Sequence, residues 1–473
     1  MVKFRYKKRL LALTMAGMLL LSGCGKNDKK DAETTSERVK SEISVTEEQK
    51  EETQEKSEEK AENEKAAAEY LSAPAGKTNI MGEDLIKGEV TDPTEEERQE
   101  FIDATADFSF NVMKALLKDS NGDNVMISPD SIISALAMTE NGADGKTLEE
   151  MMKLLGGNLS LTAYNEALSS YNTMLEGDEG VKFHNANSIW VRNDERLKVN
   201  KDFVQTNKDY YDASLYVADF DNKTIDDINA WVDENTNKMI NKVVDRIPDD
   251  AMLYLINAVA FEGAWAEQYD DSQIKEGEKF TNLKGEKEEA VFLTSLEHGY
   301  FELNGGLGFV KPYRSGIYEF VAILPPEGMS ADEYLTNIEG KDFVKAYNDR
   351  DYRADVHAKL PEFSYDYDTS LKNALIESGM ATAFSDAADF GKMADKDLMP
   401  LKIGDVIHKT HIELDRNGTK AAAVTSVEMQ VSGIIPEEKT IVDITLDRSF
   451  AYAIVDTETG LPVFLGTVNT VAK

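Results

Sequence analysis

The alternation of apolar and polar positions predicts a body that mixes helices and strands. Ser128-Pro129 is a favourable helix start, because the serine side chain can cap the first turn and proline lacks only an N–H that would be unpaired there. Apolar residues in 132–137 then lie on one helix face, and Asn141-Gly142 predicts the helix end. Thr147, with Glu150 three positions later, reads as a capping box and predicts a second helix start.

Several short apolar runs predict strands. They alternate with polar positions or are continuously apolar, and no sequence repeat of roughly 20 to 50 residues connects them. These runs are residues 188–191, 252–261, 319–324, 450–455 and 463–468. Helical and strand patterns therefore share one body.

The first 23 residues have the pattern of a signal peptide. Five basic residues precede an apolar run at 10–21, which is shorter than the roughly 20 residues of a membrane-spanning helix. Leu21-Ser22-Gly23-Cys24 resembles the bacterial lipobox, in which Cys24 becomes the lipidated first residue of the mature protein. The alternative is an ordinary secretory signal that ends near a cysteine. A multiply acylated Cys24 would hold the protein at a membrane.

Residues 24–95 are expected to form an acidic tether and connector. From 26 to about 65 more than half of the residues are charged, and such a segment cannot bury enough apolar surface to offset its ordering entropy. A lone helix rich in Glu and Lys is the alternative, since these residues can pair four positions apart. Compact sequence begins near Thr94, so the folded domain is expected at 96–473.

Composition excludes several classes of function. The chain has 473 residues and a formal net charge of −36, which would repel the phosphate backbone of a nucleic acid. A single cysteine excludes a disulfide scaffold and a cysteine-only zinc site. No nucleophile with a base and an orienting acid is visible, so the chain is not expected to be an enzyme. No cofactor is expected.

Four strings in the body resemble the serpins, the serine protease inhibitor superfamily. They occur in the family's order, and Ala451 stands where the family usually has a bulkier apolar residue. The strings are residues 124–147, 255–265, 356–363 together with 375–390, and 446–450. The resemblance implies an α+β serpin fold with about three β-sheets, roughly eight or nine helices and an exposed reactive-centre loop.

The segment from Thr419 to Ser432 carries a strand pattern of its own. Its alternate residues from Thr419 to Val431 are all uncharged, whereas the other set contains Lys420 and Glu428, so one face of a strand could be buried. No proline interrupts the segment before Pro436. A permanent amphipathic strand is one interpretation. The other is a segment that enters a sheet, because small residues at its start pack weakly in a permanent strand.

The serpin resemblance assigns roles to this segment. The scissile bond would be Ser432-Gly433, with Val431 and Met429 as alternatives, and a small residue there suggests elastase-like or subtilisin-like proteases. Arg416 and Asn417 depart from the acidic pair common before the hinge glycine. The hinge, which enters the sheet first, would comprise Gly418, Thr419, Lys420, Ala421, Ala422, Ala423, Val424 and Thr425.

The resemblance also assigns residues to the sheet that must open. Trp265 would mark the breach at its top, and a latch called the shutter would combine Ser128, Ser131, Asn257 and His408 beneath the strands that part. An ordinary polar core cluster is the alternative. His408 and His411 lie three positions apart, which places them on opposite faces of a strand, so a shared metal is not expected.

The resulting hypothesis is a monomeric protease inhibitor held on the extracellular face of a cell membrane. It would trap a serine protease, or a cysteine protease, as a covalent complex after cleavage of its loop. A non-inhibitory serpin acting as a binding or carrier module is the alternative. A solute-binding lipoprotein would share the lipobox, the acidic tether and the size of the body.

Overall fold

The computed structural model describes residues 70–71, 79–81, 85–175, 181–419 and 440–472. The predicted signal peptide, Cys24 and residues 420–439 lie outside these ranges. Within the described part of the chain, no helix is both long and apolar enough to cross a membrane.

The described residues form nine α-helices and one short 3-10 helix. The six longer helices, α2 to α7, come first along the chain, and the three shorter ones follow. Their bounds are α2 Glu95–Leu117, α3 Pro129–Glu140, α4 Gly145–Leu155, α5 Leu161–Met174, α6 Lys201–Tyr211, α7 Asn222–Asn235, α8 Ala331–Thr336, α9 Gly340–Asn348, α10 Lys372–Glu377 and η1 Thr382–Phe384.

One predicted helix start is confirmed and the other is wrong. The Ser128 side chain caps α3, and Asn141 is its C-terminal cap. The expected start at Thr147 fails, because α4 already begins at Gly145. The Thr147 hydroxyl instead accepts a hydrogen bond from the Asp389 N–H, and Glu150 binds Thr382, so both polar groups serve tertiary contacts.

Eighteen strands are described, and the five predicted strand segments are confirmed in β4, β7, β11, β17 and β18, although β7 begins one residue after the predicted 252. The bounds are β1 Tyr70–Leu71, β2 Asn79–Met81, β3 Met126–Ile127, β4 Val181–Arg192, β5 Val199–Asn200, β6 Ser214–Ala218, β7 Leu253–Ala264, β8 Ile274–Thr281, β9 Lys287–Leu303, β10 Gly306–Pro312, β11 Tyr318–Leu324, β12 Asp355–Pro361, β13 Phe363–Ser370, β14 Ile407–Asp415, β15 Gly418–Thr419, β16 Ile441–Thr445, β17 Phe450–Asp456 and β18 Pro462–Val468.

A seven-stranded sheet carries the candidate site. Its order is β13-β14-β15-β7-β4-β6-β2, so the two-residue strand β15 separates β14 from β7. At the far edge, β2 pairs with β6, although its residues 79–81 fall in the expected connector. The described part of that connector therefore contributes one strand to the sheet.

A second sheet has nine strands, with the order β16-β12-β9-β10-β11-β17-β18-β3 and β8 paired to β9. A third, two-stranded sheet joins β1 to β5. Three sheets and nine helices among the described residues agree with the α+β fold that the sequence implied.

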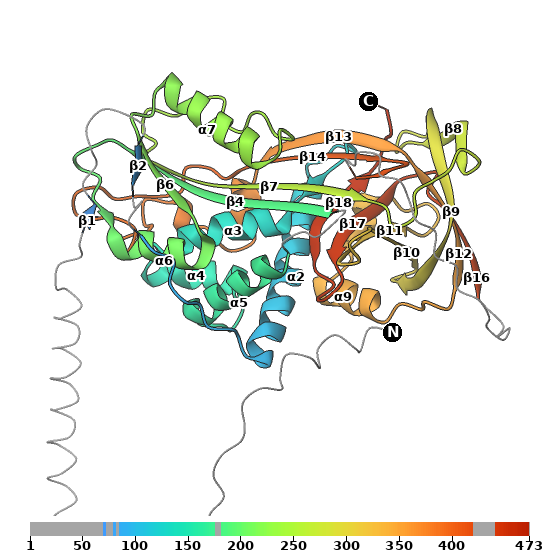
Figure 1. Cartoon of the computed structure of the whole chain (residues 1–473), viewed down its shortest axis with the longest axis horizontal. Helices are drawn as coiled ribbons and strands as arrows, with labels where there is room; N and C mark the ends of the chain where they lie inside the picture. The colour runs from blue at the N-terminus through green and yellow to red at the C-terminus, as the bar shows by residue number, and fades with distance from the viewer. Residues whose placement is uncertain (1–69, 72–78, 82–84, 176–180, 420–439, 473) are drawn as a thin grey trace, which may run out of the picture. The chain divides into compact units, whose positions relative to one another are not determined.

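The two faces of the seven-stranded sheet have different partners (Figure 1). The main hydrophobic core lies on one face, where helices α2 to α6 gather. A smaller core lies on the opposite face, where Ile228 and Val232 of α7 pack against Trp190, Ile256 and Ala258 of the sheet. We call the first the core face and the second the outer face.

Candidate functional site

The first two residues of the predicted hinge, Gly418 and Thr419, are part of the sheet. Gly418 pairs with Ala264 and Thr419 with Gly263 on β7, while the same two residues pair with Asp415 and Leu414 on β14. Thr419 is 3% exposed, and its hydroxyl lies 2.6 Å from that of Tyr313. The Thr419 side chain therefore points to the core face, the orientation that the alternating pattern requires for its uncharged set.

Trp265 forms hydrogen bonds with the backbone of residues 415–417, which directly precede the predicted hinge. Its indole N–H donates to the Asp415 carbonyl oxygen at 2.9 Å, and its backbone N–H donates to that of Asn417 at 3.0 Å. Its ring stacks on Tyr313 with a centroid distance of 4.7 Å. Trp265 thus binds the hinge entry and also positions the phenol that contacts Thr419, at the place assigned to the breach.

The residues before the hinge form a tight polar turn. The Asp415 carboxylate accepts hydrogen bonds from the N–H groups of Asn417 and Gly418, at 2.7 and 3.2 Å. Arg416 approaches Asp271 at 3.6 Å and Glu362 at 3.9 Å. The basic residue that departs from the expected acidic pair therefore lies among carboxylates.

Beyond the two residues of β15, the strands β14 and β7 are not paired with each other. Among the described residues, no backbone hydrogen bond links β14 to β7. Each strand keeps its partner on the other side, β13 for β14 and β4 for β7. The sheet thus has two halves, connected at one end by the hinge.

Three of the four predicted shutter residues form one contact group. The Ser128 N–H donates to His408 Nε2 at 3.0 Å, and the Ser128 hydroxyl accepts from the Ser131 N–H at 3.4 Å. His408 lies on β14 and the two serines begin α3. This group therefore anchors one half of the sheet to the helix beneath it.

Asn257, the fourth predicted shutter residue, belongs to the other half. Its amide nitrogen donates to Asn185 and Asn187 on β4, at 2.6 and 2.9 Å. Its buried Oδ1 has no hydrogen-bond partner among the described residues. The four residues thus form two groups on opposite sides of the unjoined strands, rather than one latch.

Burial lowers the pKa of His408 to about 4, so the ring is neutral at pH 7 and Nε2 can accept the Ser128 N–H. His411 points the other way, to Asp366 at 2.8 Å. In the described ranges, no group of three or more His, Cys, Asp or Glu side chains could hold a metal ion.

Sequence reasoning missed four residues that contribute to this site. Tyr313 gave no signal, because nothing in its local sequence connects it with Thr419. Lys311, which is 3% exposed and contacts Glu297 at 2.7 Å, places its ammonium group 5.4 Å from the Trp265 ring. Asn185 and Asn187 of β4 lie just before the apolar run 189–191, and their amides were a usable signal for buried polar partners.

The remaining predicted site residues lie outside the described residues. These are Lys420 to Thr425 of the hinge, the bond Ser432-Gly433 and Cys24.

Comparisons with known proteins point to one family. A family profile described as "Serpin (serine protease inhibitor)" matches residues 103–471. A serpin-like protein of Methanosarcina acetivorans is 28% identical over 370 residues, which cover 76% of this chain and 86% of the relative. Mouse alpha-1-antitrypsin 1-1 is 26% identical over 373 residues, covering 76% and 87%.

Solved structures agree with this result. The crystal structure of the thermophilic serpin tengpin in its native state superimposes with a TM-score of 0.76 at 39% identity, and covers 84% of this chain and 100% of tengpin. Sequence profile, relatives and fold agree over nearly the whole described body. The chain belongs to the serpin family.

Proposed function

We propose that this serpin inhibits proteases by trapping them after they cut its loop. One observation carries the proposal: the hinge residues Gly418 and Thr419 form a short strand between β14 and β7, and those strands are unjoined below it. Such a gap can accept a longer strand, whose main chain would pair with both neighbours. The same geometry argues against the alternative, a non-inhibitory serpin that serves as a carrier and whose hinge does not enter the sheet.

The register of β15 indicates where each loop residue would come to lie. Thr419 pairs with Leu414 and Gly263, and both ladders are antiparallel. Continuing each ladder for six residues brings Thr425 opposite His408 on one side and Asn257 on the other. Since Thr425 shares a face with Thr419, its hydroxyl would enter the core face beside the partnerless Asn257 oxygen.

The inserted strand would therefore join the two shutter groups. A threonine hydroxyl can both donate and accept a hydrogen bond. The Thr425 hydroxyl could therefore donate to the unpartnered Oδ1 of Asn257 on β7 and still accept a hydrogen bond from the β14 half of the sheet, where His408 lies. Sheet hydrogen bonds and newly buried apolar side chains would favour insertion, and the intact molecule would be kinetically trapped before cleavage.

Trapping would use the target's own chemistry. The serine oxygen of the protease attacks the Ser432 carbonyl carbon and forms an acyl ester, while the Ser432–Gly433 peptide bond breaks and the Gly433 amine leaves with a proton. A cysteine protease would form the thioester instead. Val431 and Met429 remain alternative cleavage positions, and the small Ser432 favours elastase-like or subtilisin-like targets.

Insertion from Thr419 to Val431 would move the attached enzyme far from the cleavage position. At about 3.3 Å per residue, these 13 residues span roughly 40 Å. Inhibition then depends on whether insertion is faster than hydrolysis of the ester.

We also propose that Cys24 anchors the inhibitor to the extracellular face of a bacterial cell membrane as a lipoprotein. The basic start, the short apolar run and the position of the only cysteine support this location. The acidic tether would hold a monomeric inhibitor domain away from the membrane surface.

The test is incubation with elastase, subtilisin and trypsin, followed by denaturing gels and mass spectrometry of the cut site. We expect a gel-stable complex with a small-residue protease and a sharply higher melting temperature after loop cleavage. Thr419→Arg, which places a charge at a buried position, should yield cleaved protein without complex. Equal melting temperatures of the intact and cut wild-type protein would overturn the proposal.

A further inference from the structure

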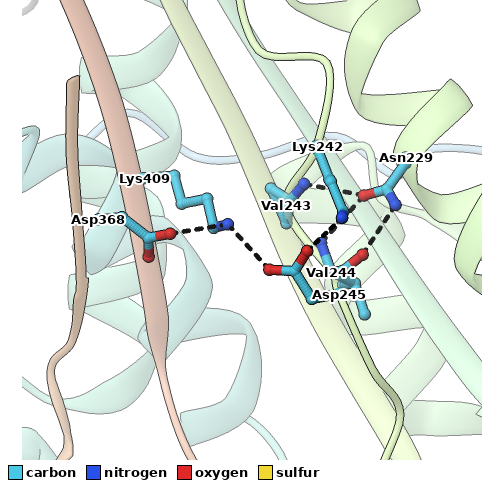
Figure 2. A network of polar contacts seen from close by, with 7 residues as sticks. All are labelled: Asn229, Lys242, Val243, Val244, Asp245, Asp368 and Lys409. Atoms are coloured by element: carbon cyan, nitrogen blue, oxygen red, sulfur yellow. Dashed lines mark hydrogen bonds and ion pairs between the residues drawn. The ribbon is translucent and has the colours of Figure 1, made fainter.

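An ion pair crosses the gap between the two halves of the sheet (Figure 2). Lys409 on β14 reaches Asp245 at 3.5 Å, and Asp245 lies on the segment that connects α7 to β7. We call residues 240–247 the α7 linker. Hydrogen bonds of the backbone do not join β14 to β7, whereas this pair of side chains connects β14 to the linker.

The α7 linker is fixed to the β7 side of the gap. The Asn229 side chain on α7 accepts hydrogen bonds from the N–H groups of Val243 and Val244, at 2.8 and 2.9 Å, and donates to the Val244 carbonyl at 2.8 Å. Val244 packs with Ala258 of β7 in the outer-face core. Asp245 therefore directly follows a segment that is held by three hydrogen bonds and by apolar contacts.

Lys409 is fixed to the other side. Besides Asp245 it contacts Asp368 on β13 at 2.8 Å, and its side chain is only 17% exposed. The contact with Asp368 remains within one half of the sheet, whereas the contact with Asp245 joins the two halves (Figure 2). A second lysine, Lys242, also contacts Asp245 but belongs to the linker itself.

An incoming strand would pass directly beneath this ion pair. Continuing the β15 register brings position 424 opposite Lys409 on β14 and Ala258 on β7. Ala258 belongs to the outer-face core with Val244, so the side chain at position 424 would point toward the α7 linker. Insertion to this depth must therefore separate or displace Asp245 and Lys409.

We propose that Asp245 and Lys409 form a clasp that slows entry of a strand into the sheet. This inference rests on the proposed function for its biological role, because the strand in question is the protein's own loop. The clasp holds the halves in the intact molecule, and its ionic character makes it weaker as salt concentration rises.

The test uses a synthetic peptide with the sequence of residues 419–431 and no protease. Incorporation is followed on native gels with full-length protein. We expect Asp245→Asn to take up the peptide about twofold to fivefold faster than wild type, the range for loss of one partly exposed ion pair. Asp245→Glu, which keeps the charge, should restore the wild-type rate.

Asp368→Asn is the matched control, since it removes a carboxylate from the same lysine without breaking the link across the gap. It should not accelerate uptake, and high salt should reduce the advantage of Asp245→Asn over wild type. Equal rates for wild type and Asp245→Asn, equal acceleration by Asp368→Asn, or no uptake by any variant would overturn the clasp.

The peptide assay also separates this inference from the proposed function. If Asp245→Asn accelerates uptake but wild type forms no complex with any protease, the clasp stands and the inhibitor proposal fails. If wild type forms complexes but all variants take up peptide at one rate, the inhibitor proposal stands and the clasp fails.

Discussion

The hydroxyl of Thr419 lies 2.6 Å from the phenolic oxygen of Tyr313, and both side chains are buried. The phenol in turn stacks on Trp265, whose N–H donates to the Asp415 carbonyl oxygen. This contact places Thr419, the second residue of the predicted hinge, inside the sheet. Insertion would therefore extend a strand that is already started, which avoids the cost of beginning a new one.

The Thr419–Tyr313 contact should be measurable as a coupling energy. Tyr313→Phe leaves the buried Thr419 hydroxyl without its partner, and Thr419→Val removes the other side of the contact. We expect each single variant to lower stability by about 1 kcal/mol and the double variant to cost less than their sum. Melting temperatures of the four proteins give the comparison, and strict additivity would show that the contact contributes nothing.

Gly418 should not tolerate a side chain. Its φ is +152°, and a Cβ atom there would lie 2.0 Å from the carbonyl oxygen of Gly263. Gly418→Ala should therefore expel the hinge from its seat at a strain on the order of 1–3 kcal/mol, and should reduce complex formation about tenfold. Gly404→Ala, where the space around the glycine is open, is the control and should behave as wild type.

Hydrogen exchange would reveal the expelled hinge directly. In wild type the Asp415 carboxylate should protect the amide of Gly418 and the β15 ladder that of Thr419, and in Gly418→Ala this protection should be lost. Unchanged protection would show that the local backbone can adapt to the methyl group.

Thr425→Val should weaken the cut molecule and leave the intact one unchanged. The valine keeps the shape of threonine but cannot bond the Asn257 oxygen, so the cut form should lose about 1–2 kcal/mol. Ser426→Ala, on the outer face in the same register, is the control. Melting temperatures before and after cleavage test this, and a similar loss from both variants would contradict the register.

Stability should depend on pH through a buried acid beneath the sheet. Burial, together with the charge of Asp456, raises the pKa of Asp130 to about 7, and the Asn185 side chain donates to its Oδ2. The unfolded chain releases this proton near pH 3.8, so the folded state binds more protons between these values. Stability from this group therefore falls as pH rises through that window.

His408 has the opposite effect. The pKa of its buried ring is about 4 against 6.5 in the unfolded chain, so the unfolded state binds the extra proton and stability falls as pH drops from 6.5 to 4. The effects of Asp130 and His408 on the pH dependence of stability therefore partly cancel in wild type. The free energy of unfolding of Asp130→Asn should therefore rise relative to that of wild type as pH increases from about 4 to about 7, by up to about 4 kcal/mol, and melting temperatures across this range measure it. A constant difference across this range would refute the buried-acid argument.

The proposed lipid anchor on Cys24 can be tested separately. Cys24→Ser should move the protein from the membrane fraction to the soluble fraction, and the mature wild-type N-terminus should carry a lipid mass on Cys24. Protease inhibition by the soluble variant should be unchanged, because the tether and the inhibitory loop are separate segments. A wild-type N-terminus without lipid would favour the ordinary secretory signal.

The sequence by itself determined the helices and strands with strong periodic patterns, and the family strings identified the fold. The start of α3 was predictable because its cap is local, Ser128 with Ser131. The Thr147 capping box was wrong because its groups bind Asp389 and Thr382, far along the chain. The alternation of uncharged and polar residues from Thr419 onward was enough to predict that the Thr419 side chain is buried.

Only the tertiary structure decided which groups meet across the sheet. It divided the predicted shutter between His408 on β14 and Asn257 on β7, paired Thr419 with Tyr313, and placed Asp245 against Lys409. These partners lie far apart in sequence, and their contact depends on strand order and register. Local patterns carry no information about register between distant strands, because it is fixed by packing of the whole core.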